Sequence, residues 1–216
     1  MQRRFSVPAW FLRPLPWALL AILVLFRKDF EQTMTRQMLL HIPLIMLTGV
    51  WLGNQLTHAL ERLSATSRFW QRLYGVGKEI NTYGMSGLLL ATLTGMFWMI
   101  PKALDDVLLH GPVAFAKFAS VLVAGMVLMP SWHRAHPVIR VFFLGGFCWT
   151  SAIAGMLYQE STNRLCNFYL LDDQVWAGRG LVILAVLLPA SWALIEVVHH
   201  RRRLREQDQT APDQDS

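Results

Sequence analysis

Long blocks of apolar residues, separated by short polar connections, constrain this chain more than any other feature of its sequence. A bilayer core about 30 Å thick is crossed by a helix of roughly 20 apolar residues. Blocks of about that length recur along the whole chain. We therefore predict an all-α, polytopic integral membrane protein, a bundle of about six transmembrane helices at residues 8–26, 38–60, 85–100, 113–129, 138–158 and 180–198.

The composition supports a membrane protein and argues against a nucleic-acid-binding one. Of all residues 54% are hydrophobic and 16% are charged, against about 25% charged in soluble domains. The formal net charge is +6, but the basic residues gather in the connections and form no stripe alternating with aromatic residues. We expect contact with membrane lipid and no nucleic-acid partner. Two cysteines, Cys148 and Cys166, do not make a disulfide framework.

The distribution of basic residues predicts an orientation. Most Lys and Arg residues lie in the connections on one side, and the positive-inside rule makes that side cytoplasmic. Both termini are then cytoplasmic, and the connections 27–37, 101–112 and 159–179 face outward. We expect one transmembrane domain over residues 1–200. The basic and then polar tail 201–216 is expected to be disordered.

The outward connections and the adjacent helix ends gather side chains that can bind metal. His41 and Met38 lie in the first turn of the expected helix 38–60, while Cys166 and Asp173 lie in the connection 159–179. Thioether, thiolate and imidazole groups suit copper, and the sulfur ligands suit Cu(I). The alternative is structural: methionines are adaptable packing residues, and His41 can bond a loop carbonyl. Asp173 can equally cap the expected helix 180–198.

Two other interpretations are weaker. A two-haem carrier would use His41 and His58 with facing histidines at matching depths, but the later predicted helices contain no mid-span histidine. A small ion-coupled transporter usually carries a charged residue at mid-membrane depth, whereas Arg13, Arg140 and Arg179 lie near helix ends. The sequence has no nucleophile elbow and no H-E-x-x-H motif, so we do not expect an enzyme.

Two segments together resemble a known family. TRQMLLHIPLIML looks like the H-M-x-x-H-x-x-L segment of the CtaG-type (caa3-type) cytochrome c oxidase assembly proteins, and DDQVWAG is similar to their D-Q-x-x-A-G signature. The resemblance places His41 at the second histidine, and Asp173, Gln174, Ala177 and Gly178 at the signature residues. Gln37 stands at the first histidine, so this chain would be a diverged member.

The resemblance implies a copper-linked role in the inner membrane. The chain would assist copper insertion into, or assembly of, a respiratory oxidase or another copper enzyme. Its expected metal ligand is His41, with Met38 and Cys166 as partners and Asp173 as a supporting group or helix cap. The alternative is an accessory or structural subunit of a respiratory complex that binds no metal. Homo-oligomerisation is left open.

Overall fold

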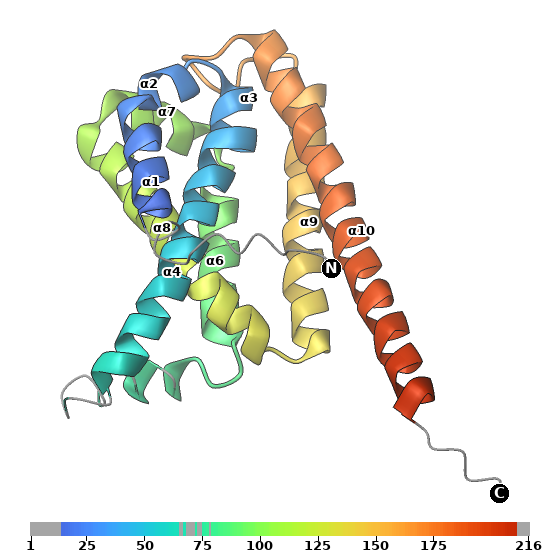
Figure 1. The fold of residues 1–216 in the computed structure, drawn as a ribbon. Coiled ribbons are helices and arrows are strands. Elements are labelled where there is room, and N and C mark those ends of the chain that lie inside the picture. Colours follow the sequence, from blue (N-terminus) through green and yellow to red (C-terminus); the bar gives the residue numbers. More distant parts are fainter. Residues whose placement is uncertain (1–13, 65–66, 68–71, 73–74, 78, 211–216) are drawn as a thin grey trace, which may run out of the picture.

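Every regular element that the structure describes is a helix. The computed structural model describes residues 14–64, 67, 72, 75–77 and 79–210. Figure 1 shows the elements in chain order: α1 (Leu15–Leu25), α2 (Arg27–Phe30), α3 (Met34–Arg36), the π-helical turn η1 (Gln37–His41), α4 (Ile42–Ser64), α6 (Met85–Phe97), α7 (Pro101–Leu109), α8 (Gly111–Arg134), α9 (Pro137–Glu160) and α10 (Leu171–Thr210).

The described residues confirm an all-helical fold, and the long apolar helices are compatible with a membrane protein, but six spans are not confirmed. Four are long and apolar enough to cross a membrane: Met34–Leu60, Gly111–Arg134, Pro137–Glu160 and Leu171–Arg202. α6 and α7 are long and apolar enough to cross a membrane only when they are taken together, and a bend of 77° separates them. α1 has 11 residues, too few to cross alone. The beginning of the expected helix 8–26 lies outside the described residues.

Several helices extend further than the apolar blocks predicted. The helix expected at 38 begins at Met34, where the Thr33 side chain accepts a hydrogen bond from the Arg36 N–H as an N-cap. α10 begins at Leu171 rather than 180 and continues to Thr210, so helix extends into the first part of the tail 201–216; disorder of that tail stays a prediction. The expected loop 101–112 is mostly α7, because Pro101 begins a new helix at its first position.

Glycines set how closely the long helices approach one another. A Cβ on Gly125 of α8 would lie 2.2 Å from the Met46 carbonyl oxygen, and one on Gly49 of α4 would lie 2.3 Å from that of Leu122. α9 and α10 meet in the same way at Gly155 and Gly178. Such backbone contact between helices is typical of membrane bundles, where small residues permit close packing.

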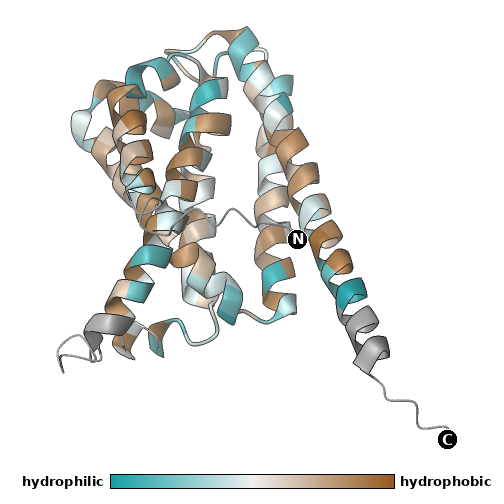
Figure 2. Cartoon of the chain, viewed as in Figure 1, coloured by the Kyte–Doolittle hydropathy of each residue, from teal (hydrophilic) through white to brown (hydrophobic). Residues whose placement is uncertain are grey.

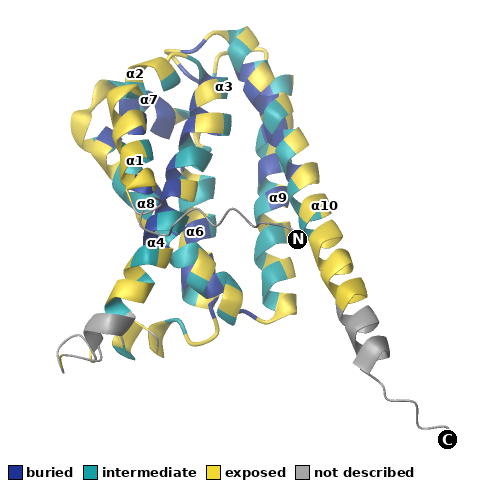
Figure 3. Ribbon diagram, in the orientation of Figure 1, coloured by how far each residue is buried: buried dark blue, intermediate teal, exposed yellow. Residues whose placement is uncertain are grey.

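The surface of the bundle suits a lipid environment. Figure 2 shows apolar residues along the middle of the helices and polar residues towards their ends. Large apolar side chains face outward, among them Phe115, Phe142 and Trp149, and Figure 3 shows much of α10 exposed. Helices apolar on their outer faces need lipid or a partner to cover them.

The three connections predicted to share one side do lie together. α2, α3, α7 and residues 161–170 all occupy one end of the bundle in Figure 1, which we call the α7 end. Hydrogen bonds tie them: the Tyr169 hydroxyl to the Glu31 carbonyl, and the Asn167 N–H to the Asp105 carboxylate. That this end faces outward, with cytoplasmic termini opposite, stays a prediction.

Candidate functional site

Asp173 joins the two segments that carry the family resemblance. It lies in the first turn of α10, and its carboxylate accepts hydrogen bonds from the Met34 N–H, the Thr35 N–H at 3.3 Å and the Thr35 hydroxyl at 2.7 Å. The first N–H groups of a helix lack internal partners and favour a negative charge. Asp173 therefore caps the helix that begins at Met34, and not its own helix as the sequence predicted.

The other residues of the DDQVWAG segment also have structural contacts. The Gln174 side chain accepts from the Leu165 N–H at 2.9 Å and donates to the Tyr158 carbonyl at 3.1 Å. Ala177 is fully buried. A Cβ on Gly178 would lie 2.5 Å from the Gly155 carbonyl oxygen. Each matched position thus fixes how α10 packs at the α7 end.

Gln37, at the position of the family's first histidine, belongs to a buried hydrogen-bonded group. The Tyr169 hydroxyl contacts both the Gln37 side-chain oxygen and the Glu31 carbonyl oxygen, the latter at 3.1 Å. Burial, and then the charge of Glu31, raise the pKa of Tyr169 above its ordinary value. The phenol therefore keeps its proton and acts as a donor. The Gln37 amide nitrogen has no partner among the described residues.

A buried ion pair lies at the same end, and the sequence interpretation missed it. Lys117 Nζ lies 2.5 Å from Glu31 Oε1; both side chains are almost fully buried, and Arg27 approaches Glu31 at 3.8 Å. Lys117 is the only charged residue between positions 113 and 129. A single charged residue in an apolar block is the sequence feature that points to this ion pair, because an ionisable residue inside a membrane helix is presumed functional and needs a partner.

His41 lies beside this ion pair, on the last residue of η1. Its Nε2 is 3.3 Å from the Leu23 carbonyl oxygen, so this nitrogen carries the ring proton. The ring stacks on Phe30 at 5.1 Å and meets the edge of Phe118 at 5.2 Å. Nδ1 is then the unprotonated nitrogen, and it has no hydrogen-bond partner in the described part of the chain. Single π-helical turns are frequent at functional sites.

Three sulfur-containing side chains share a buried cluster. Met34, Met38 and Cys166 pack together with Tyr158 and Tyr169, and Met99 packs at the edge of the cluster. The Cys166 thiol donates to the Pro101 carbonyl oxygen at 3.5 Å. Burial first, and then the nearby Asp105 and Asp173 carboxylates, raise the pKa of Cys166 to about 12. At neutral pH this residue is therefore a thiol.

The four predicted ligands occupy three environments. Met38 and Cys166 lie in the sulfur cluster. His41 contacts Leu23, Phe30 and Phe118, which belong to or pack against a different buried cluster. Both Asp173 oxygens accept hydrogen bonds from the start of the neighbouring helix. Across the described residues, no group of three or more His, Cys, Asp or Glu side chains could hold a metal ion. The residues that fit soft-metal chemistry are Met34, Met38 and Cys166.

Comparisons with protein-family models, with curated proteins and with solved structures find no match to this chain. The family resemblance thus rests on the two short segments alone, and function is a matter for proposal.

Proposed function

We propose that this chain assists copper insertion into, or assembly of, a respiratory oxidase in a bacterial inner membrane. The observation that carries the proposal is the shared buried cluster of Met34, Met38 and Cys166 at the α7 end. The two segments that resemble CtaG-type proteins supply Met38 and Asp173, and Asp173 ties them together directly. The chain would act as a carrier or assembly partner and not as an enzyme.

The chemistry of the cluster suits transient binding of Cu(I). Two thioethers and one thiol are soft donors of the kind that Cu(I) prefers. Copper would bind the thiolate, so loading would release the Cys166 proton. Because the pKa of that thiol is raised to about 12 by burial and the two nearby carboxylates, apparent copper affinity should increase with pH. A raised thiol pKa also favours release, since reprotonation competes with the metal.

The first test is copper stoichiometry of the detergent-purified chain loaded under reducing conditions. We expect near-stoichiometric copper in the wild type and its loss in Cys166→Ser and in Met34→Leu/Met38→Leu. Cys148→Ser and Met156→Leu are the matched controls, because Cys148 is a buried cysteine outside this cluster and Met156 is an exposed methionine. Equal copper in every variant, or none in the wild type, would reject the sulfur site.

His41→Ala separates two versions of the site. If the sulfur residues suffice, this variant keeps its copper. If copper depends on His41 as well, the bare Nδ1 completes the ligand set. Copper lost from a terminal oxidase purified from cells lacking this chain, and restored by re-expression, would tie the metal to assembly.

An accessory subunit that binds no metal is the second candidate. It is favoured by the hydrogen bonds of Asp173 and Gln174 to other segments of the chain, which explain both side chains by packing alone. Its signature is stable co-purification with a large respiratory complex at fixed stoichiometry, without copper bound to this chain. A carrier should instead associate with its target only during assembly.

A further inference from the structure

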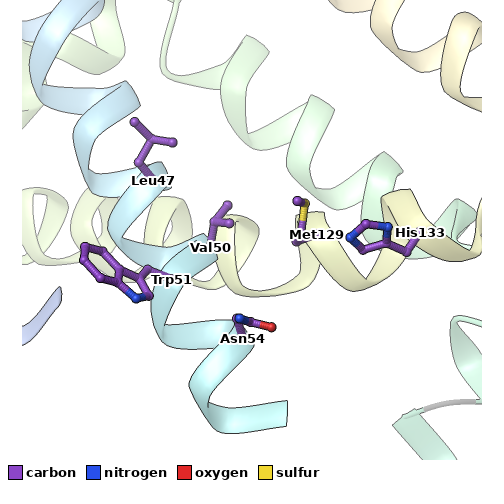
Figure 4. A pocket seen from close by; sticks show the side chains of 6 residues that line it. All are labelled: Leu47, Val50, Trp51, Asn54, Met129 and His133. Atoms are coloured by element: carbon purple, nitrogen blue, oxygen red, sulfur yellow. The ribbon is translucent and has the colours of Figure 1, made fainter. Parts of the chain in front are cut away.

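A groove between α4 and α8 lies away from the sulfur cluster and plays no part in the proposed copper role. It measures about 320 Å³ and is lined by Leu47, Val50, Trp51, Asn54, Met129 and His133. Binding sites for small molecules begin at about 300 Å³. Figure 4 shows the Asn54 amide and the His133 ring pointing towards the same space from the two helices.

The polar and apolar parts of the groove are ordered along the helices. At 1.5 Å per residue, Asn54 lies about 30 Å along the helix that begins at Met34, and His133 about 33 Å along α8. If the α7 end marks one face of the bilayer, both polar residues lie near the opposite interface, since the core is about 30 Å thick. Leu47 and Val50 lie deeper, towards mid-membrane. The groove is polar at the interface and apolar within.

Asn54 and His133 supply the amide and imidazole groups of the groove. Neither the Asn54 amide nor the His133 ring makes a side-chain hydrogen bond with the described residues, whereas the neighbouring Arg134 donates to the Asn81 carbonyl oxygen at 3.4 Å, away from the groove. Both residues are exposed at the surface of the helices. These groups are therefore available to a bound molecule.

We infer that this groove binds a lipid-soluble quinone, with its ring carbonyls at Asn54 and His133 and its tail along Leu47 and Val50. Asn and neutral His offer N–H donors, which match two carbonyl acceptors. Trp51 and Met129 supply aromatic and polarisable surface for a flat ring. The six lining residues include no Lys or Arg, which a phosphate headgroup would favour. A quinone therefore fits better than a phospholipid.

The test is a titration of the detergent-purified full chain with decylubiquinone, followed by calorimetry. Asn54→Leu and His133→Leu should each weaken binding about three- to tenfold, as expected for one hydrogen bond. His110→Leu is the matched control, since His110 is an exposed histidine at the α7 end. Met129→Trp should abolish binding by filling the groove while both donors remain. A photoreactive azidoquinone with the same tail should crosslink to α4 and α8.

Two outcomes would overturn this assignment. Equal apparent affinity in all five proteins would mean that the quinone merely partitions into the detergent micelle. Co-purifying phospholipid whose amount depends on Asn54 and His133, with no such dependence for quinone, would assign the groove to a phospholipid. Neither result would bear on the copper proposal, which uses other residues at the other end.

Discussion

At the scale of single residues, the decisive feature is a charge placed where the apolar sequence predicted none. Glu31 and Lys117 are buried together at the α7 end, with Tyr169, Gln37 and His41 around them. A buried pair is weak evidence for stability by itself, but removing one partner leaves an uncompensated charge. The pair therefore fixes how α2 sits against α8.

Replacing one partner tests this directly. Lys117→Met should lower the free energy of unfolding by up to about 3–5 kcal/mol, the usual cost of breaking a buried ion pair, because only the more distant Arg27 then remains near Glu31. Lys117→Met/Glu31→Gln should recover a large part of that loss, because no buried charge remains. Lys28→Met, at an exposed position of α2, is the control. Denaturant unfolding in detergent is the measurement, and a double variant as unstable as the single one would contradict the pairing.

The capping role of Asp173 can be tested against a closely matched control, because an exposed aspartate, Asp172, directly precedes it. Asp173→Ala removes the cap from the Met34 helix and should cost about 1–2 kcal/mol of stability. Asp172→Ala should cost far less, since only Asp173 hydrogen-bonds that helix. Hydrogen exchange at the Met34 and Thr35 amides should accelerate in the first variant alone. Equal acceleration in both would mean that general charge, and not the cap, matters.

Cys166 should show unusual pH behaviour in the metal-free protein. Its folded pKa of about 12 lies above the ordinary value of 9.0, through burial and the nearby Asp105 and Asp173. Its contribution to stability is therefore complete below about pH 9 and decreases as the pH rises towards 12. Maleimide alkylation of the folded protein should stay slow at pH 8 and become fast on unfolding. Rapid alkylation of the folded chain at pH 8 would contradict a buried, protonated thiol.

At the scale of helices, close backbone contact between α9 and α10 depends on two glycines. Gly178→Ala would bring a Cβ to 2.5 Å from the Gly155 carbonyl oxygen, so the helices must separate, at a cost of about 1–3 kcal/mol for overpacking. Gly145→Ala on α9 has nothing within 4 Å of the new Cβ and should be neutral or stabilising through helix propensity. Thermal unfolding compares them, and equal melting temperatures would argue against the contact.

The sequence predicted helix type better than helix ends. Apolar length identified α8 and α9 closely, because hydropathy reports lipid exposure directly. It missed the earlier starts of the Met34 helix and α10, because their first turns are polar and are held by Asp173, Thr33 and tertiary contacts. It also predicted a loop where the short helix α7 lies. The buried Asp105 of this helix accepts a hydrogen bond from the Asn167 N–H. Such contacts join distant parts of the chain and leave no local pattern.

The two segments that the sequence singled out lie together in the structure, but the sequence did not show which of their side chains share a space. The segment around His41 and the DDQVWAG segment were both identified, and the structure places them in contact. Which predicted ligands share a space depended on the faces of helices whose register changes at η1. Lys117, in contrast, was visible as a lone charge and was overlooked.

At the scale of the whole molecule, the basic residues predict which end of the bundle faces the cytoplasm. Arg134, Arg140, Arg201 and Arg202 lie at helix ends opposite the α7 end, so the positive-inside rule predicts that this basic end is cytoplasmic. Asn163→Cys should then react with a membrane-impermeant maleimide on intact spheroplasts, and His200→Cys only after permeabilisation. Both native cysteines are buried and provide a low background. The reversed pattern would invert the bundle.

The hydrogen bond from the Met34 N–H to Asp173 joins positions 139 residues apart, which has a consequence for biosynthesis. At about 5–20 residues per second, translation covers that interval in roughly 7–28 s. Throughout this time Met34 and Met38 have been synthesised, while the Asp173 cap is still to come. The α7 end can therefore close only after the start of α10 has been synthesised. The time available for any cargo or chaperone to enter there is then set by the rate of translation.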